Sequence, residues 1–183
     1  MLAMWENLFK NKDTSQEIKD LLKSTHLFQD LSSRELKLLE GMVHVRHFRV
    51  GEAIFRQGEV GVGMYIVSYG SIEICIEDGS LSATDDESQI TRVTRLKSGD
   101  FFGELSLVED NSRRGASAIA QEEAALIGFF KPDLFEIIER NPSMGAKILF
   151  RLSEALGRRL KATTSKVTEL KKEIGKLTVL DDK

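Results

Sequence analysis

The chain has 183 residues, of which 41% are hydrophobic and 30% are charged, and its formal net charge is -3. This length allows one sizeable core, and the composition argues against a disordered chain or a membrane span. The acidic balance also argues against binding to nucleic acid or to an anionic membrane surface. Residues 1–9 lack the basic start and long apolar stretch of a signal peptide, so we expect a cytoplasmic protein.

Two short helices are expected at the N-terminal end. Apolar residues recur at helical spacing from Ser15 to about Gly41, and the pattern is interrupted at residues 28–31, ahead of Ser32 and Ser33. We therefore interpret residues 1–41 as an N-terminal helical segment.

Residues 42–130 change to short β-like runs separated by glycines, which predict a jelly roll or barrel. The clearest strand spans residues 72–77, where three isoleucines alternate with other residues and should share one core-facing side. Cys75 lies in this strand and is the only cysteine, which excludes an internal disulfide and a multi-cysteine metal site. We expect Cys75 to be a buried, inert thiol.

A polar stretch follows this strand at residues 79–89, and it indicates a hairpin loop and not an active site. Strand signals resume over residues 90–96 and again over 116–130. The predicted fold class is α+β: an antiparallel β-roll (jelly roll) with N-terminal helices and a long C-terminal helix.

Residues 131–183 are predicted to form a hinge helix and a long C-terminal helix. Pro132 suits the first turn of a helix that ends near Arg140, and Asn141 and Pro142 separate it from a last helix running toward Leu177. The last helix carries an apolar stripe: Leu149, Leu152, Leu156, Leu160, Val167, Leu170, Ile174 and Leu177. The stripe could cover the protein's own barrel, but it extends past where the roll needs covering, so we favour a homodimer seam.

The most informative segment runs from Gly99 to Val108 and is followed, after a short polar break, by residues 113–117. Gly103 permits close backbone approach, and a helical turn over residues 104–107 would direct free N–H groups at an anion. An arginine from the next strand would neutralise that anion. Glu104 is unfavourable beside an anion unless it accepts a hydrogen bond, for example from a ribose hydroxyl, so the segment indicates a nucleotide.

The segment Phe102 to Leu107, together with Arg114 and Ala116, resembles the phosphate-binding cassette of the cyclic-nucleotide-binding domain family. Similar segments are Gly51 to Glu59 and Met64 to Val67, and the resemblance extends from about residue 27 to residue 170. Within that family, the last helix is most similar to the dimer helix of the bacterial catabolite activators, the cyclic-AMP receptor proteins.

The resemblance implies a role for each matching residue. Glu104 would accept the ribose 2'-hydroxyl, and Arg114 would pair with the cyclic phosphate. Thr163 and Thr164 would meet the adenine, one from each subunit of the dimer, although such threonines commonly bond only the local backbone. The predicted ligand site is Phe102, Gly103, Glu104, Leu105, Arg114, Gly115, Ala116, Thr163 and Thr164, with backbone contacts from Gly103 and Ala116.

Two positions depart from the family pattern. Gly115 stands where catabolite activators have a serine and cyclic-GMP binders often a threonine, so we expect modest affinity and a preference for cyclic AMP over cyclic GMP. Arg113 replaces a proline of many family members. Strand alternation lets only one of the two adjacent arginines point inward, and we expect this to be Arg114.

These features predict a cyclic-nucleotide-binding regulatory protein without a cofactor, a metal site or an enzymatic activity, since no nucleophile has a credible base beside it. Only six residues follow Leu177, so we expect signalling through the C-terminal helix to an unknown effector protein and not to DNA. Two alternatives stay open: an interaction module with a degenerate pocket, and a sensor for cyclic GMP or another cyclic nucleotide.

Overall fold

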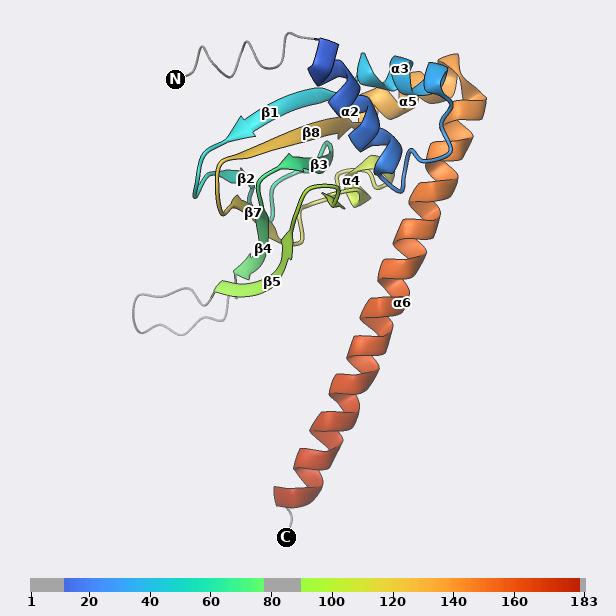
Figure 1. Ribbon diagram of the computed structural model, residues 1–183. Helices are drawn as coiled ribbons and strands as arrows, with labels where there is room; N and C mark the ends of the chain where they lie inside the picture. Colours follow the sequence, from blue (N-terminus) through green and yellow to red (C-terminus); the bar gives the residue numbers. More distant parts are fainter. Residues whose placement is uncertain (1–11, 78–89, 182–183) are drawn as a thin grey trace.

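The computed structural model describes residues 12–77 and 90–181 (Figure 1). Its strands are β1 (His44–Phe48), β2 (Ala53–Phe55), β3 (Gly63–Tyr69), β4 (Ile72–Glu77), β5 (Ile90–Leu96), β6 (Phe101–Phe102), β7 (Ser117–Ala120) and β8 (Ala124–Phe130). Its helices are α2 (Lys12–Ser24), α3 (Ser33–Glu40), α4 (Leu105–Val108), α5 (Lys131–Arg140) and α6 (Pro142–Asp181). No helix within the described ranges is long and apolar enough to cross a membrane.

The strands form two antiparallel sheets, with the orders β1-β8-β3-β6 and β2-β7-β4-β5. In the first sheet Tyr65 lies opposite Gly128, and in the second Ile72 lies opposite Ala120. Val67 and Leu126 of the first sheet pack with Ile72 of the second in one buried cluster, so the two sheets share a core. The predicted antiparallel β-roll is confirmed, and so are the predicted strands over residues 72–77 and 90–96.

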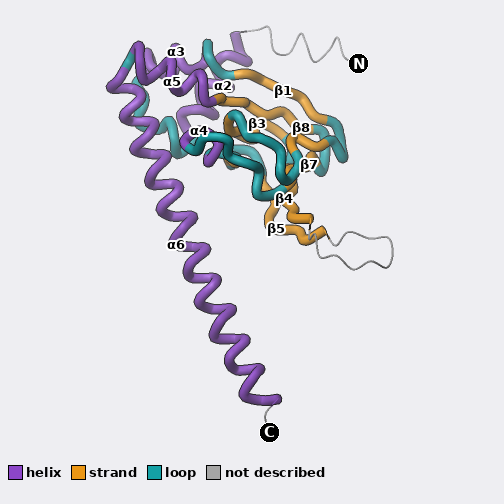
Figure 2. Tube along the Cα trace, turned by 180° about the vertical axis from the view of Figure 1, so that it is seen from behind, coloured by secondary structure: helices purple, strands orange, loops and turns teal. Residues whose placement is uncertain are grey.

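The first sheet also has a second buried face, because successive side chains of a strand point to opposite sides. Met64 and Ile66 on β3, and Ile127 and Phe129 on β8, pack with the helices in a separate core. Each such side chain contributes about 1.5–3 kcal/mol on full burial. This helical layer fixes the position of α6 relative to the roll (Figures 1 and 2).

The N-terminal helices are held to α6 by charged contacts. Ser32 and Glu35 form a capping box that starts α3, as the break in the helical pattern predicted. The Glu35 carboxylate also accepts hydrogen bonds from the Lys147 ammonium at 2.9 Å through both oxygens. One helical turn further along α6, Arg151 donates to both oxygens of Asp30, at 2.6 and 2.9 Å. The segment before β1 is therefore part of the surface on which α6 rests.

The expected core-facing row of isoleucines in β4 is only partly correct. Ile72 is fully buried and Ile74 packs against the core between the sheets, but Ile76 is 37% exposed. The pairing of β4 with β7 ends at Cys75, so Ile76 lies beyond the shared core. Cys75 is buried, as predicted, and its thiol donates to the Ser117 carbonyl at 3.8 Å. The loop predicted at residues 79–89 lies outside the described residues.

Helix α5 begins and ends, and helix α6 begins, where the prolines predicted, while α6 continues past Leu177 to Asp181. Pro132 lies in the first turn of α5, and the Asn141 side-chain oxygen accepts from the Met144 amide at the start of α6. The apolar stripe of α6 divides into two parts. Leu152 is buried in the protein's own core, whereas Leu160 is 69% exposed. From residue 160 on, the side chains of α6 are exposed and the helix extends away from both sheets (Figure 2), so only the first part of the stripe covers the roll.

Candidate nucleotide-binding site

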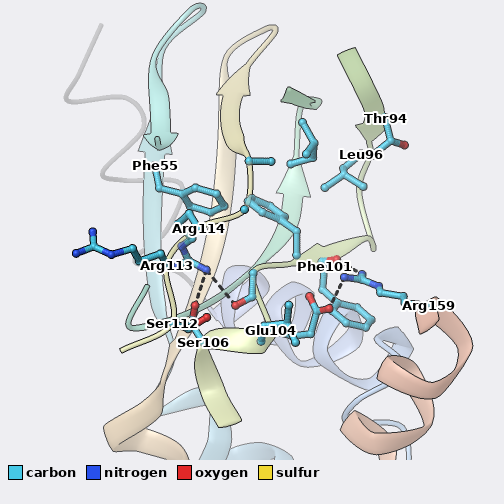
Figure 3. A pocket seen from close by; sticks show the side chains of 16 residues that line it. Phe55, Thr94, Leu96, Phe101, Glu104, Ser106, Ser112, Arg113, Arg114 and Arg159 are labelled. Carbon is cyan, nitrogen blue, oxygen red and sulfur yellow. Dashed lines mark hydrogen bonds and ion pairs between the residues drawn. The ribbon is translucent and has the colours of Figure 1, made fainter. Parts of the chain in front are cut away.

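A cavity of about 480 Å³ lies between the β-roll, the α4 turn and α6. This is within the size of typical small-molecule sites, about 300–1,000 Å³. Its polar end is built from the segment around Gly103 and from residues 112–116, and its other end is apolar (Figure 3). One arginine of α6, Arg159, also lines it.

The backbone at the polar end turns as the sequence predicted. Gly103 has a φ of +78°, a conformation that side chains other than glycine rarely adopt. The single turn of α4 follows at Leu105, with Glu104 as its first flanking residue. The Gly103 carbonyl accepts from the Ser106 amide at 3.2 Å, which closes the turn around the cavity.

Arg114 is the buried cation of the site. It is 8% exposed, and its guanidinium donates to the Gly103 carbonyl at 3.0 Å and to the Gly63 carbonyl at 2.7 Å. The Ser106 hydroxyl also accepts from it at 3.0 Å, and its Cζ lies 4.1 Å from the centre of the Phe55 ring. All of these acceptors are neutral, and burial lowers the pKa of Arg114 below its ordinary value. Within the described ranges no carboxylate pairs with this charge, so a ligand anion could neutralise it.

Two glycines make the space that Arg114 occupies. A Cβ added at Gly61 would lie 2.0 Å from the Ser106 Oγ and 3.0 Å from the Arg114 Cζ. A Cβ added at Gly103 would lie 2.4 Å from the Arg114 Nη1. The guanidinium is thus held in place by sterics as well as by hydrogen bonds, which fixes the direction of its remaining donors.

Glu104 is the second buried charged group and is 3% exposed. Its Oε1 accepts from the Arg159 Nη1 at 2.5 Å, whereas its Oε2 is buried without a hydrogen-bond partner. A buried acceptor that lacks a donor costs about 1–3 kcal/mol. A hydroxyl of a bound molecule could supply the missing hydrogen bond.

Arg159 was not among the predicted site residues. Its Nη2 donates to the Phe101 carbonyl at 2.7 Å, and its Cζ lies 4.9 Å from the centre of the Phe101 ring. One signal could have found it: Arg159 follows Leu152 by seven residues and Leu156 by three, so it shares the face of α6 that rests on the roll. Arg159 connects α6 to the cavity.

The neighbouring Arg113 points away from the cavity (Figure 3), and its Nη1 donates to the Gly58 carbonyl at 2.8 Å. Arg113 is exposed, whereas Arg114 is buried. The structure therefore directs Arg114 inward and Arg113 outward, as predicted, although both residues precede β7 and Arg113 forms only an isolated bridge with Val60.

Of the apolar end, the sequence predicted only Phe102. Phe55, Ile74 and Leu96 also line it, with Thr94. These side chains come from four different strands, β2, β4, β5 and β6. Single apolar residues in strands are usually core, so only the sheet pairing shows that they meet at one cavity.

Seven of the nine predicted site residues line the cavity, and two do not. The seven are Phe102, Gly103, Glu104, Leu105, Arg114, Gly115 and Ala116. Thr163 and Thr164 are exposed further along α6, and the Thr163 hydroxyl donates to the Arg159 carbonyl at 3.0 Å. Their contact with adenine stays a prediction. No group of three or more metal-ligating side chains occurs in the part of the chain that the structure describes.

Known proteins share this sequence and architecture. The chain is 32% identical to the cyclic AMP receptor protein of Thermus thermophilus over 73% of its own length and 60% of the relative's. It is 29% identical to the cAMP-activated global transcriptional regulator CRP of Salmonella typhimurium over 69% of its length and 55% of the relative's. A cGMP-dependent protein kinase of Drosophila melanogaster is 32% identical over 53% of this chain and 10% of the kinase. The chain thus spans little more than half of the two bacterial relatives.

The fold comparison agrees. The Thermus thermophilus catabolite activator protein superposes with a TM-score of 0.68 at 29% identity, over 80% of this chain and 63% of that one. The structure of cAMP-bound PfPKA-R superposes with a TM-score of 0.59 at 26% identity, over 72% of this chain and 44% of that one. The cyclic nucleotide-binding domain family matches residues 45–141, which contain the cavity segment from Phe101 to Ala116. The chain therefore belongs to the cyclic nucleotide-binding domain family.

Proposed function

We propose that this chain is a regulatory sensor of cyclic AMP and not an enzyme. One observation carries the proposal: among the described residues, the same cavity holds a buried cation without a carboxylate partner, Arg114, and a buried carboxylate oxygen without a donor, Glu104 Oε2. A cyclic nucleotide supplies both missing partners, since its phosphate is an anion and its ribose carries a free 2'-hydroxyl. A ligand with only one of the two groups would leave the other unsatisfied.

Two observations favour cyclic AMP over cyclic GMP. Three of the similar proteins named above are described as receptors of cyclic AMP, activated by it or bound to it, although one relative is cGMP-dependent. Gly115 has no hydroxyl to offer a ligand. The apolar end of the cavity, around Ile74 and Leu96, suits the face of either purine base, and Thr94 is its polar group.

Thermal unfolding with cyclic AMP, cyclic GMP, 5'-AMP or buffer alone tests this proposal. A ligand that binds only the native state at a hundredfold excess over its Kd adds about 2.7 kcal/mol to the free energy of unfolding. For this chain length we expect cyclic AMP to raise Tm by roughly 5–10 °C and 5'-AMP to leave it nearly unchanged. Equal shifts with cyclic AMP and cyclic GMP would contradict the base preference. No shift with any nucleotide would favour an interaction module with a degenerate pocket.

The proposed signal passes from the cavity to α6 by two routes. Arg159 joins Glu104 directly to the helix. Lys131, at the start of α5, pairs with Asp110 just after the α4 turn, so a displaced turn pulls on the hinge helix. A nucleotide that binds more tightly when α6 lies closed over the base would shift the population toward that arrangement. Thr163 and Thr164 would then approach the adenine.

We also infer a homodimer through the exposed part of the apolar stripe. Leu160, Val167 and Leu170 are 69, 45 and 44% exposed and follow one another in steps of seven and three, which is the spacing of a coiled-coil seam. The substitution Leu170→Asp would place a charge in this seam, so we expect it to yield a monomer by sedimentation. Ser165→Asp, on the opposite side of the helix, is the matched control and should remain dimeric. A Leu170→Asp protein that still sediments as a dimer would place the interface elsewhere.

A further inference from the structure

The exposed part of α6 carries the strongest concentration of charge in the chain. Residues 157–176 contain seven lysines and arginines and two glutamates, so this segment has a net charge of +5, while the rest of the sequence carries -8. All of these residues are exposed, and after Arg159 the segment extends away from both sheets in the two views (Figures 1 and 2).

Four of the cations lie on one side of the helix. At about 100° per residue they fall within a sector of about 60°, opposite the apolar stripe. They form what we call the basic face: Arg158, Lys161, Lys172 and Lys176. A homodimer joined through the stripe would leave this face outward on both helices.

The described part of the chain does not neutralise the basic face. Over residues 12–77 and 90–181, none of its four cations takes part in an ion pair. Of the two nearby acids, Glu169 pairs with Lys166 at 2.8 Å, and this contact lowers the pKa of Glu169. Arg159 is held by Glu104. The face is therefore open to an external anionic surface.

We propose that the basic face docks an acidic segment of the effector protein. A long anion such as a DNA duplex, or a flat anionic membrane, would extend past the helix and meet the acidic remainder of the chain, which repels it. A short acidic helix avoids this repulsion, because the cations from Arg158 to Lys176 extend over about 27 Å of helix axis. The cations of the basic face are placed so that each can meet a carboxylate on one side of a partner helix.

This docking extends the proposed sensor function. Its signalling role depends on that function, but the binding of an acidic segment does not. Arg158 adjoins Arg159, which contacts Glu104 in the cavity. If nucleotide changes the position of α6, it changes the affinity of the basic face for the effector, and the effector changes the affinity for nucleotide by the same factor.

The test uses the full chain and an alanine-based peptide of about 20 residues with a glutamate at every third or fourth position, which in helical form spans about 30 Å. Its binding is followed by fluorescence anisotropy, with a short DNA duplex and phosphatidylserine–phosphatidylcholine vesicles as the other arms. The variant replaces Arg158, Lys161, Lys172 and Lys176 by glutamine. We expect the affinity of this variant for the peptide to fall by about tenfold, because four exposed ionic contacts are lost.

The control variant removes the same charge from the roll and α3, by replacing Arg34, Arg46, Arg49 and Arg95 by glutamine. It should bind the peptide as the unchanged protein does. Equal losses in both variants, or tighter binding to the duplex or the vesicles than to the peptide, would overturn the proposal. The Tm shift with cyclic AMP is measured on the same preparations: its absence in the unchanged protein would refute the sensor function and leave the peptide result standing.

Discussion

The substitution Arg114→Ala is expected to nearly abolish cyclic-nucleotide binding, with a loss of at least about thirtyfold in affinity, because truncating one partner of a buried charge pair costs about 2–5 kcal/mol. Isothermal titration with cyclic AMP measures this loss. The expected size follows from the position of the guanidinium, which is 8% exposed and donates only to neutral acceptors, whereas Arg113 bonds the Gly58 carbonyl and Arg159 is held by Glu104.

The comparison variant is Arg113→Ala, which removes the adjacent and outward-facing arginine. We expect its affinity for cyclic AMP to fall far less than that of Arg114→Ala. Circular dichroism shows whether each variant is folded, since Arg114→Ala also removes hydrogen bonds to Gly63 and Gly103. Undiminished binding in a folded Arg114→Ala protein, or a larger loss in Arg113→Ala, would refute the assignment of the phosphate contact.

The parts that the sequence predicted well are those encoded over short distances. The β-roll, the two N-terminal helices and the break at Asn141 follow from local periodicity and turn residues. The polar end of the cavity was found because Gly103, Glu104 and Arg114 lie within twelve residues of one another. Because these site residues lie close together in the sequence, they can be recognised as one motif before the fold is known.

The parts that the sequence did not predict arise from long-range contacts. Arg159 reaches Glu104 from 55 positions away, and Phe55 and Leu96 meet only because their sheets close around the cavity. Ile76 is exposed because the β4–β7 pairing ends at Cys75, which strand alternation within β4 does not reveal. Such features depend on which strands pair with one another and in which register. The hydrophobic pattern of a single strand does not specify its partner strand.

The position of Arg159 links the free energy of ligand binding in the cavity to the position of α6. In this structure one carboxylate oxygen of Glu104 accepts a hydrogen bond from Arg159, and the other has no partner among the described residues. A ribose hydroxyl can therefore bind Oε2 while the ion pair to α6 persists, so ligand and helix need not compete for the carboxylate. Simultaneous contacts reinforce each other when one fixes the geometry that the other needs.

Replacing Glu104 by glutamine is expected to remove the distinction between cyclic AMP and 2'-deoxy cyclic AMP. In the unchanged protein the 2'-hydroxyl would donate to the charged Oε2, and a hydrogen bond to a charged group contributes about 1.5–3 kcal/mol. We therefore expect cyclic AMP to bind about 10- to 100-fold more tightly than its 2'-deoxy analogue, and the two ligands to bind Glu104→Gln to within a few-fold of each other.

A second variant separates this contact from the ion pair. Arg159→Gln breaks the link to α6 but retains the Glu104 carboxylate, so it should still discriminate between the two ligands even if both bind more weakly. Both ligands are titrated into the unchanged protein and into the two variants. Each variant then gives one thermodynamic cycle in which the protein substitution is combined with removal of the 2'-hydroxyl. Equal discrimination in the unchanged protein and in Glu104→Gln would show that the ribose hydroxyl lies elsewhere. Loss of discrimination in Arg159→Gln as well would show that Arg159 must orient the carboxylate before the ribose can bind it.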